Sequence, residues 1–148
     1  MRSPGFEIGE LRFLYVGIAD TTAALAFSTE HLGAHLRWRF QRFGADVAGL
    51  ELGSGPLVLL ADHRPIGSVL PIYAVDDLTA AVERLRAAGA RVLGPMGTPE
   101  GDAIVVEVPD ESGGPYELAF LEVVRPGAMD QAYADPGNDH RVRDDAGA

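Results

Sequence analysis

Hydrophobic and polar residues alternate along several short stretches of the chain, and this period of two predicts β-strands. The clearest case is residues 12–20 (RFLYVGIAD), in which Leu14, Val16 and Ile18 mark one well-defined apolar face. Glycine and proline separate this strand from others of similar length. Further strands are predicted at residues 36–43, 47–52, 57–63, 68–76, 91–95, 103–108 and 116–123.

Two stretches with helical character each follow acidic residues that can cap a helix. Asp20 precedes TTAALAFSTEHLG, and Asp76 with Asp77 precedes LTAAVERLRAAG. An acidic side chain at the N-cap accepts a hydrogen bond from a free backbone N–H of the first turn. Gly33 and Gly89 then predict the two C-terminal ends, because glycine readily adopts the left-handed conformation found there.

The order of these elements occurs twice along the chain. Each half is predicted as strand, helix and three strands, and the halves align at offsets that agree within a few residues, Tyr15 with Ile72 and Asp20 with Asp77. A repeat of this kind decides the fold. We therefore predict an α+β protein of two tandem β-α-β-β-β modules. The predicted division is an N-terminal arm (1–10), a first module (11–66), a second module (67–124) and an acidic C-terminal tail (125–148), disordered or loosely docked.

The two-module pattern resembles the vicinal oxygen chelate superfamily, which includes glyoxalase I, extradiol dioxygenases, fosfomycin-resistance enzymes and bleomycin-resistance binding proteins. The likeness covers about residues 11–124. It rests on VGIADTTAALAF and HLG in the first half, and on IYAVDDLTAAVERLRAAGA and DESGGPYEL in the second. The resemblance implies a curved mixed sheet around a cleft, with the helices on its outer face. Phe13 and Tyr15 would then face the cleft, because side chains alternate along a strand.

The resemblance also implies where a metal ion would be bound. Metal-dependent relatives place His or Gln, Glu, His and Glu on the first and last strands of the two modules. The matching residues here are Phe13, Val58, Leu70 and Glu117, of which only the last has a donor atom. A divalent ion needs three or four oxygen or nitrogen donors. We therefore predict no metal site and no other cofactor.

Composition removes further chemistry. All 12 basic residues are arginine, and the chain has no lysine and no cysteine. Without lysine it cannot form a Schiff base, and without cysteine it has no thiolate nucleophile. A formal net charge of −10 argues against nucleic acid and permits a cationic ligand. No apolar run approaches the ~20 residues of a membrane span, and the N-terminus lacks a signal-peptide pattern. We expect a cytoplasmic protein that binds neither nucleic acid nor membrane.

The predicted lining of the cleft is mostly apolar, with Glu117 as its one ionisable group. Such a site buries an apolar or aromatic molecule and orients it with few polar groups. On residues 36–43 the sequence leaves open whether the aromatic residues or Arg37 and Arg39 face the cleft. The predicted ligand-binding residues are Phe13, Tyr15, Trp38, Phe40, Val58, Leu60, Leu70, Ile72, Glu117, Ala119 and Leu121.

Two functions from different classes fit these observations. The first is a metal-free binding protein of the bleomycin-resistance type, holding a bulky aromatic or cationic compound such as an antibiotic. The alternative is a metal-independent lyase, isomerase or cyclase, with Glu117 as acid or base and a mobile loop at residues 95–102 closing over the substrate. A metal-dependent glyoxalase- or dioxygenase-like enzyme comes third. The resemblance further implies a homodimer.

Overall fold

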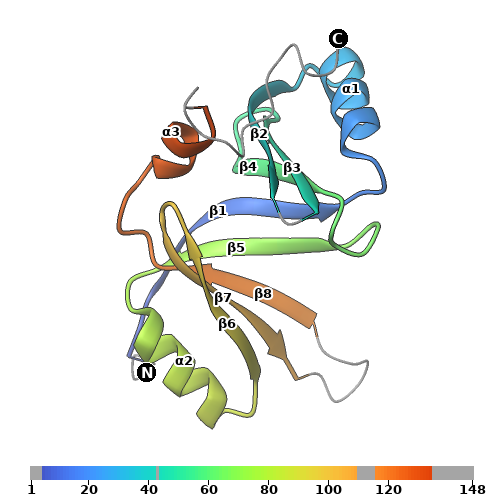
Figure 1. Cartoon of the computed structure of the whole chain (residues 1–148). Coiled ribbons are helices and arrows are strands. Elements are labelled where there is room, and N and C mark those ends of the chain that lie inside the picture. The colour runs from blue at the N-terminus through green and yellow to red at the C-terminus, as the bar shows by residue number, and fades with distance from the viewer. Residues whose placement is uncertain (1–4, 43, 110–115, 135–148) are drawn as a thin grey trace. The chain divides into compact units, whose positions relative to one another are not determined.

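The computed structural model describes residues 5–42, 44–109 and 116–134, and within them the predicted element order is found twice (Figure 1). The α+β class and the two β-α-β-β-β modules are confirmed. The first module consists of β1 (Ile8–Gly17), α1 (Thr21–His31), β2 (His35–Arg42), β3 (Ala45–Glu51) and β4 (Leu57–Ala61). The second consists of β5 (Val69–Val75), α2 (Leu78–Ala87), β6 (Arg91–Thr98), β7 (Gly101–Val108) and β8 (Tyr116–Leu121). A third helix, α3 (Ala128–Ala134), follows.

By their internal contacts the residues form two compact units. Unit 1 comprises Met1–Arg12 and Leu70–Pro126, and unit 2 comprises Phe13–Val69 and Gly127–Ala148. The first half of β1 therefore belongs to unit 1 and its second half to unit 2. In each unit the first strand of a module pairs in parallel with the last, β1 with β4 and β5 with β8, and the remaining pairs within the modules are antiparallel. The division predicted from the sequence, at residues 66 and 67, stays a prediction.

In unit 2 the apolar residues that face α1 form one core. Val16 of β1 and Ile18, which follows the strand, pack with Ala24 and Leu25 of the helix, as the alternation predicted. The other members are Ala34, Ala48, Leu50, Val58 and Leu60. Burial of these side chains holds α1 against one face of the sheet and leaves the opposite face for other contacts.

Capping fixes the start of α1. The Asp20 carboxylate accepts from the Ala23 backbone N–H at 3.0 Å, which confirms the predicted cap. The buried Thr21 hydroxyl donates to the Asp46 carbonyl at 2.9 Å and so ties the helix to β3. Gly33, at φ +70°, ends this segment in the conformation that favours glycine.

In unit 1 the corresponding core lies between α2 and its strands. Its buried members are Phe6, Val75, Leu78, Ala81, Ile104, Val106 and Phe120. Asp77 caps α2 by accepting from the Ala80 N–H at 3.0 Å, as predicted. Asp76 instead accepts from the Glu7 N–H at 2.6 Å, and so holds the residues before β1 against the end of β5.

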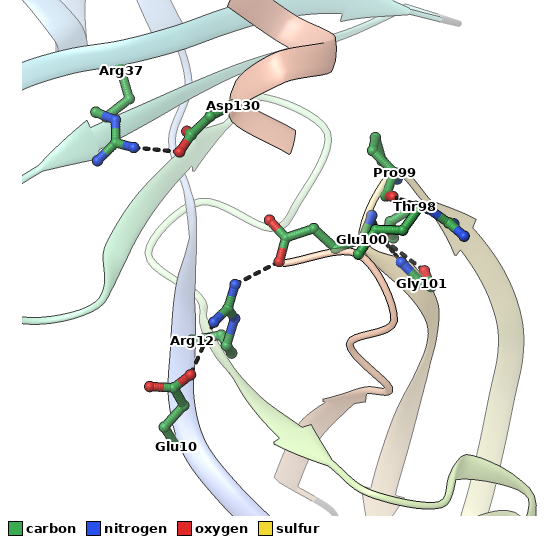
Figure 2. Close-up of polar contacts among 9 residues, drawn as sticks. Glu10, Arg12, Arg37, Thr98, Pro99, Glu100, Gly101 and Asp130 are labelled. Atoms are coloured by element: carbon green, nitrogen blue, oxygen red, sulfur yellow. Dashed lines mark hydrogen bonds and ion pairs between the residues drawn. The ribbon is translucent and has the colours of Figure 1, made fainter. Parts of the chain in front are cut away.

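Residues 95–102 are not the mobile loop that the sequence suggested. β6 continues to Thr98 and β7 begins at Gly101, so that Met96–Thr98 pair with Gly101–Ala103 in antiparallel register. The Thr98 hydroxyl donates to the Gly101 carbonyl at 2.7 Å, and the Glu100 N–H donates to the Thr98 hydroxyl oxygen at 3.2 Å (Figure 2). These residues therefore form a hydrogen-bonded hairpin in place of an irregular loop.

Part of the predicted C-terminal tail is ordered. Residues Ala128–Ala134 form α3, in which Met129 is buried, and residues 135–148 lie outside the described part of the chain. Among the described residues, no helix is both long and apolar enough to cross a membrane.

Candidate functional site

The structure settles which face of β2 carries the aromatic side chains. The Arg39 guanidinium donates to the Asp46 carboxylate at 2.9 and 2.6 Å and to the Thr22 hydroxyl of α1 at 2.8 Å, so it lies on the α1 side of unit 2. Trp38 and Phe40, one residue to either side, therefore lie on the face opposite α1. We call this opposite face the aromatic face of unit 2.

The strand register extends the aromatic face across unit 2. Trp38 pairs with Gly49, Gly49 with Leu59, and Leu59 with Tyr15, so these four residues form one row over β2, β3, β4 and β1. Side chains that pair directly across strands point to the same face of a sheet. Trp38 and Tyr15, far apart in the sequence, therefore share the aromatic face.

Trp38 lies closely over the backbone of Gly49. A Cβ atom added at that glycine would come within 2.7 Å of the indole ring, which leaves no room for any side chain there. The indole is 4 % exposed, and its Nε1–H is buried without a hydrogen-bond partner in the described part of the chain. An unsatisfied buried donor costs about 1–3 kcal/mol, so a site that keeps one is a candidate for binding an acceptor.

Helix α3 contributes a third ring to the aromatic face. The Tyr133 ring stacks on Phe40 with the centroids 4.4 Å apart and an interplanar angle of 15°, and it contacts Trp38 at 4.9 Å. The sequence analysis missed Tyr133, because the composition of the tail favoured disorder and nothing local pairs it with β2. Trp38, Phe40 and Tyr133 are called the aromatic cluster below.

An arginine lies beside the aromatic cluster. Arg37 is the extra residue of a β-bulge between Leu36 and Trp38. Its guanidinium pairs with Glu51 of β3 and with Asp130 of α3, and Figure 2 shows the second of these pairs. A bulge re-aims a side chain that would otherwise follow the alternation. Hydrogen bonding to Glu51 raises the pKa of Arg37, whose charge is therefore permanent.

At the far end of the row Tyr15 contacts His63, which follows β4. The Tyr15 hydroxyl lies 3.1 Å from His63 Nε2, and the two rings meet edge to face. Desolvation raises the pKa of Tyr15, so its hydroxyl keeps its proton. Desolvation also lowers the pKa of His63, against the opposing effect of Asp62, so its ring is neutral near pH 7.

The pKa of His63 predicts an acid-sensitive contribution to stability. Because the folded-state pKa is lowered, the unfolded chain binds more protons as the pH falls below about 6.5, and stability is lost in that direction. We expect the urea midpoint to fall between about pH 6.5 and 5, and His63→Gln to remove part of that fall. His31→Gln, on an exposed residue of α1, is the control. A His63→Gln chain that keeps the whole pH dependence contradicts the assignment.

Two residues predicted for the cleft lie on the other face of unit 2. Val58 pairs with Leu14, and Leu60 with Val16, so both pack beneath α1. Leu57 and Leu59 take the positions next to Phe13 and Tyr15 instead. The prediction was wrong by one residue of register, which reverses the face of every side chain on a strand. The run LVLL has no polar residue by which the sequence could fix it.

In unit 1 the predicted residues of β5 and β8 share one face, opposite α2. Leu118 and Phe120 pack toward α2, so Glu117, Ala119 and Leu121 alternate to the other side. Ile72 pairs with Ala119, and Leu70 lies two residues from Ile72 on the same face. Opposite Glu117 on β7 is Glu107, whose carboxylate lies 3.7 Å from Arg91. A role of Glu117 as acid or base stays a prediction.

The residues at the family's metal positions do not offer a donor set. Phe13 and Leu70 are buried hydrocarbons, and the corrected register puts Leu57 or Leu59 in place of Val58, again without a donor atom. In the described ranges no three histidine, aspartate or glutamate side chains gather closely enough to hold a metal ion. Glu117 alone does not supply the donors that a divalent ion needs.

The repeated β-α-β-β-β order, with its two capped helices, defines a protein of the two-module class that the sequence resembles. The chain belongs to the Glyoxalase/Bleomycin resistance protein/Dioxygenase superfamily, whose model matches residues 11–118. No curated protein matches the chain at a significant level.

Solved structures support the same fold. The methylmalonyl-CoA epimerase of Mycobacterium tuberculosis is 21% identical, with a TM-score of 0.64 over 82% of this chain and 93% of that one. A hypothetical protein of Bacillus halodurans is 16% identical, with a TM-score of 0.63 over 78% and 95%. A Streptomyces coelicolor methylmalonyl-CoA epimerase variant, in complex with 2-nitronate-propionyl-CoA, is 17% identical, with a TM-score of 0.61 over 78% and 96%. At these identities the likeness concerns the fold.

Proposed function

We propose that this protein binds a small molecule with a flat aromatic ring on the aromatic face of unit 2, without a metal ion. The observation that carries the proposal is the geometry of the aromatic cluster, in which Phe40 and Trp38 hold a third ring at stacking distance. Gly49 supports the proposal, because its missing side chain lets the indole lie flat. Offset or stacked rings contribute about 0.5–1.5 kcal/mol beyond their buried area.

The finer parts of this function are proposals as well. An antibiotic is one class of bulky aromatic compound that such a face would take, and we propose a cytoplasmic homodimer that binds it unchanged. A cationic compound, which the acidic composition permits, is less well matched to a face that carries Arg37. Catalysis by Glu117, in a metal-independent lyase, isomerase or cyclase, stays the alternative.

A matched pair of ligands tests the proposed function. We expect 2-naphthol to bind saturably in isothermal titration calorimetry, and its saturated counterpart decahydro-2-naphthol, which has the same hydroxyl but no flat ring, to bind far more weakly. Phe40→Leu keeps an apolar side chain and removes the ring, so it should weaken 2-naphthol binding roughly three- to tenfold.

The control variant is Phe27→Leu, on an exposed phenylalanine of α1. This substitution removes a ring from the opposite side of the sheet and should leave the affinity unchanged. Equal binding of the two ligands, or no saturable binding of either, contradicts the proposed function.

A further inference from the structure

Helix α3 contacts β2 through two side chains of different chemistry. The Asp130 carboxylate pairs with Arg37, and the Tyr133 ring packs on Phe40 and Trp38 (Figure 2 shows the first of these). Residues three apart lie on the same side of a helix, so α3 presents a carboxylate and an aromatic ring to the sheet together. This combination is the chemistry of an aromatic carboxylic acid.

We propose that α3 is an internal occupant of the ligand site, and that the ligand is an aromatic compound with a carboxylate or similar anionic group. The inference rests on the proposed function and adds the chemical class of the ligand. The ligand ring takes the place of Tyr133 against Phe40 and Trp38. Its anionic group takes the place of Asp130 on Arg37, and α3 moves away when the ligand binds.

The helix depends on its contacts with the sheet, and its ion pair is a weak one. At seven residues α3 is too short to be stable apart from the surface on which it packs. The side chains of Arg37 and Asp130 are 39% and 40% exposed, and ion pairs so open to solvent contribute little to stability. When Asp130 leaves, Arg37 keeps its contact with Glu51, so its charge is never left without a partner.

Trp38 supplies an independent reason for a ligand to replace α3. Its buried Nε1–H has no hydrogen-bond partner among the described residues while Tyr133 lies against the indole. An acceptor on the ligand that reaches this N–H makes a hydrogen bond that α3 does not make. Because an unmade bond at a buried donor is costly, that acceptor favours the ligand over the helix.

Arg37 determines the sign of charge that the site prefers. The chain has a formal net charge of −10, because its 22 acidic residues outnumber its 12 basic ones. Against that background a bulge directs one guanidinium toward the rim of the aromatic cluster, where it already holds a carboxylate of the same chain. Guanidinium groups bind carboxylates well because their fork of N–H donors matches two oxygens.

The experiment compares 2-naphthoate with its neutral analogue 2-naphthamide in the full-length chain and in Tyr133→Ala. When α3 covers the site in most molecules, the apparent affinity for the ligand is the intrinsic affinity multiplied by the fraction of molecules in which the site is open. We therefore expect Tyr133→Ala to bind 2-naphthoate about tenfold more tightly than the unchanged chain, and 2-naphthamide to bind more weakly to both.

Asp130→Asn, a conservative change, should also raise the affinity for 2-naphthoate. Tyr116→Ala, on an exposed tyrosine of unit 1, is the control and should change nothing.

Hydrogen–deuterium exchange reports on α3 directly. Saturation with 2-naphthoate should speed exchange at the amides of residues 128–134, because the helix loses the surface on which it packs. Binding of 2-naphthoate with unchanged exchange, or weaker binding in Tyr133→Ala, overturns the displacement of α3 and leaves the proposed function standing. Equal affinity for 2-naphthamide overturns the anionic class. If no aromatic compound binds any of these chains, the proposed function and this inference both fail.

Discussion

Replacing Trp38 by alanine should lower the free energy of unfolding by about 3–5 kcal/mol and remove the binding of aromatic compounds. The indole is 4 % exposed, lies over Gly49 and contacts both Phe40 and Tyr133. Its removal leaves a cavity that Gly49, which has no side chain, cannot fill from below. Urea unfolding followed by circular dichroism measures the loss, since Trp38 is the chain's one tryptophan and fluorescence disappears with it.

Trp38→Phe separates the two effects of this substitution. Phenylalanine keeps a flat ring over Gly49 and removes the buried N–H, so a smaller loss of stability is expected than for alanine. It also removes the Trp38 N–H that we propose donates to an acceptor on the ligand. The affinity for 2-naphthoate should therefore be lower than in the unchanged chain, and the affinity for 2-naphthol should change less. An alanine variant less than about 1 kcal/mol below the unchanged chain would mean that the aromatic cluster carries little of the stability of unit 2.

The sequence contained the information for the modules but not for the face of β2. Residues 36–41 have apolar side chains at one parity and arginines with glutamine at the other, and either parity could face α1. What decides the face is the bond between Arg39 and Asp46, a residue of the next strand. A contact of this kind depends on strand register, which the period of two does not specify.

Two further features depended on partners that lie far away in the sequence. α3 is short, and the contacts that hold it come from Arg37, Trp38 and Phe40, which lie about ninety residues earlier in the chain. The β6–β7 hairpin was obscured by its glycines and prolines, which usually mark a loop. In both cases local composition predicted irregular structure, and tertiary contacts outweighed it.

The repeat, in contrast, was readable because its signals are local. Asp20 and Asp77 cap the two helices through hydrogen bonds to residues three positions further on, and Gly33 and Gly89 end them at positive φ. Each signal acts within one turn of backbone, so no distant partner is needed to interpret it. The family and the fold follow from these signals, whereas the ligand site follows from register and from α3.

The second large effect is expected at Gly101, the first residue of β7. A Cβ atom there would lie 1.9 Å from the backbone carbonyl oxygen of Glu122, and the residue has φ +151°, which other residues rarely adopt. The oxygen belongs to backbone and cannot swing away. Two backbone hydrogen bonds hold this segment in place. The Glu122 N–H donates to the Asp102 carbonyl at 3.0 Å, and the Val124 N–H donates to the Glu100 carbonyl at 2.8 Å. Gly101→Ala should therefore lower the free energy of unfolding by at least about 3 kcal/mol.

Gly97→Ala, in the same hairpin, is the matched control for this substitution. The nearest atom to an added Cβ there is a side-chain oxygen of Asp102 at 3.9 Å, an ordinary van der Waals distance. The two variants add the same methyl group to the same pair of strands, so their difference reports the overlap with the Glu122 carbonyl together with the strain of the positive φ at Gly101. Because the Glu122 carboxylate also accepts from the Leu78 N–H at 3.1 Å, a shift of this backbone should loosen the start of α2. We expect faster amide exchange in α2 of Gly101→Ala and unchanged exchange in α2 of Gly97→Ala. Equal stability of the two variants would show that the hairpin absorbs the overlap.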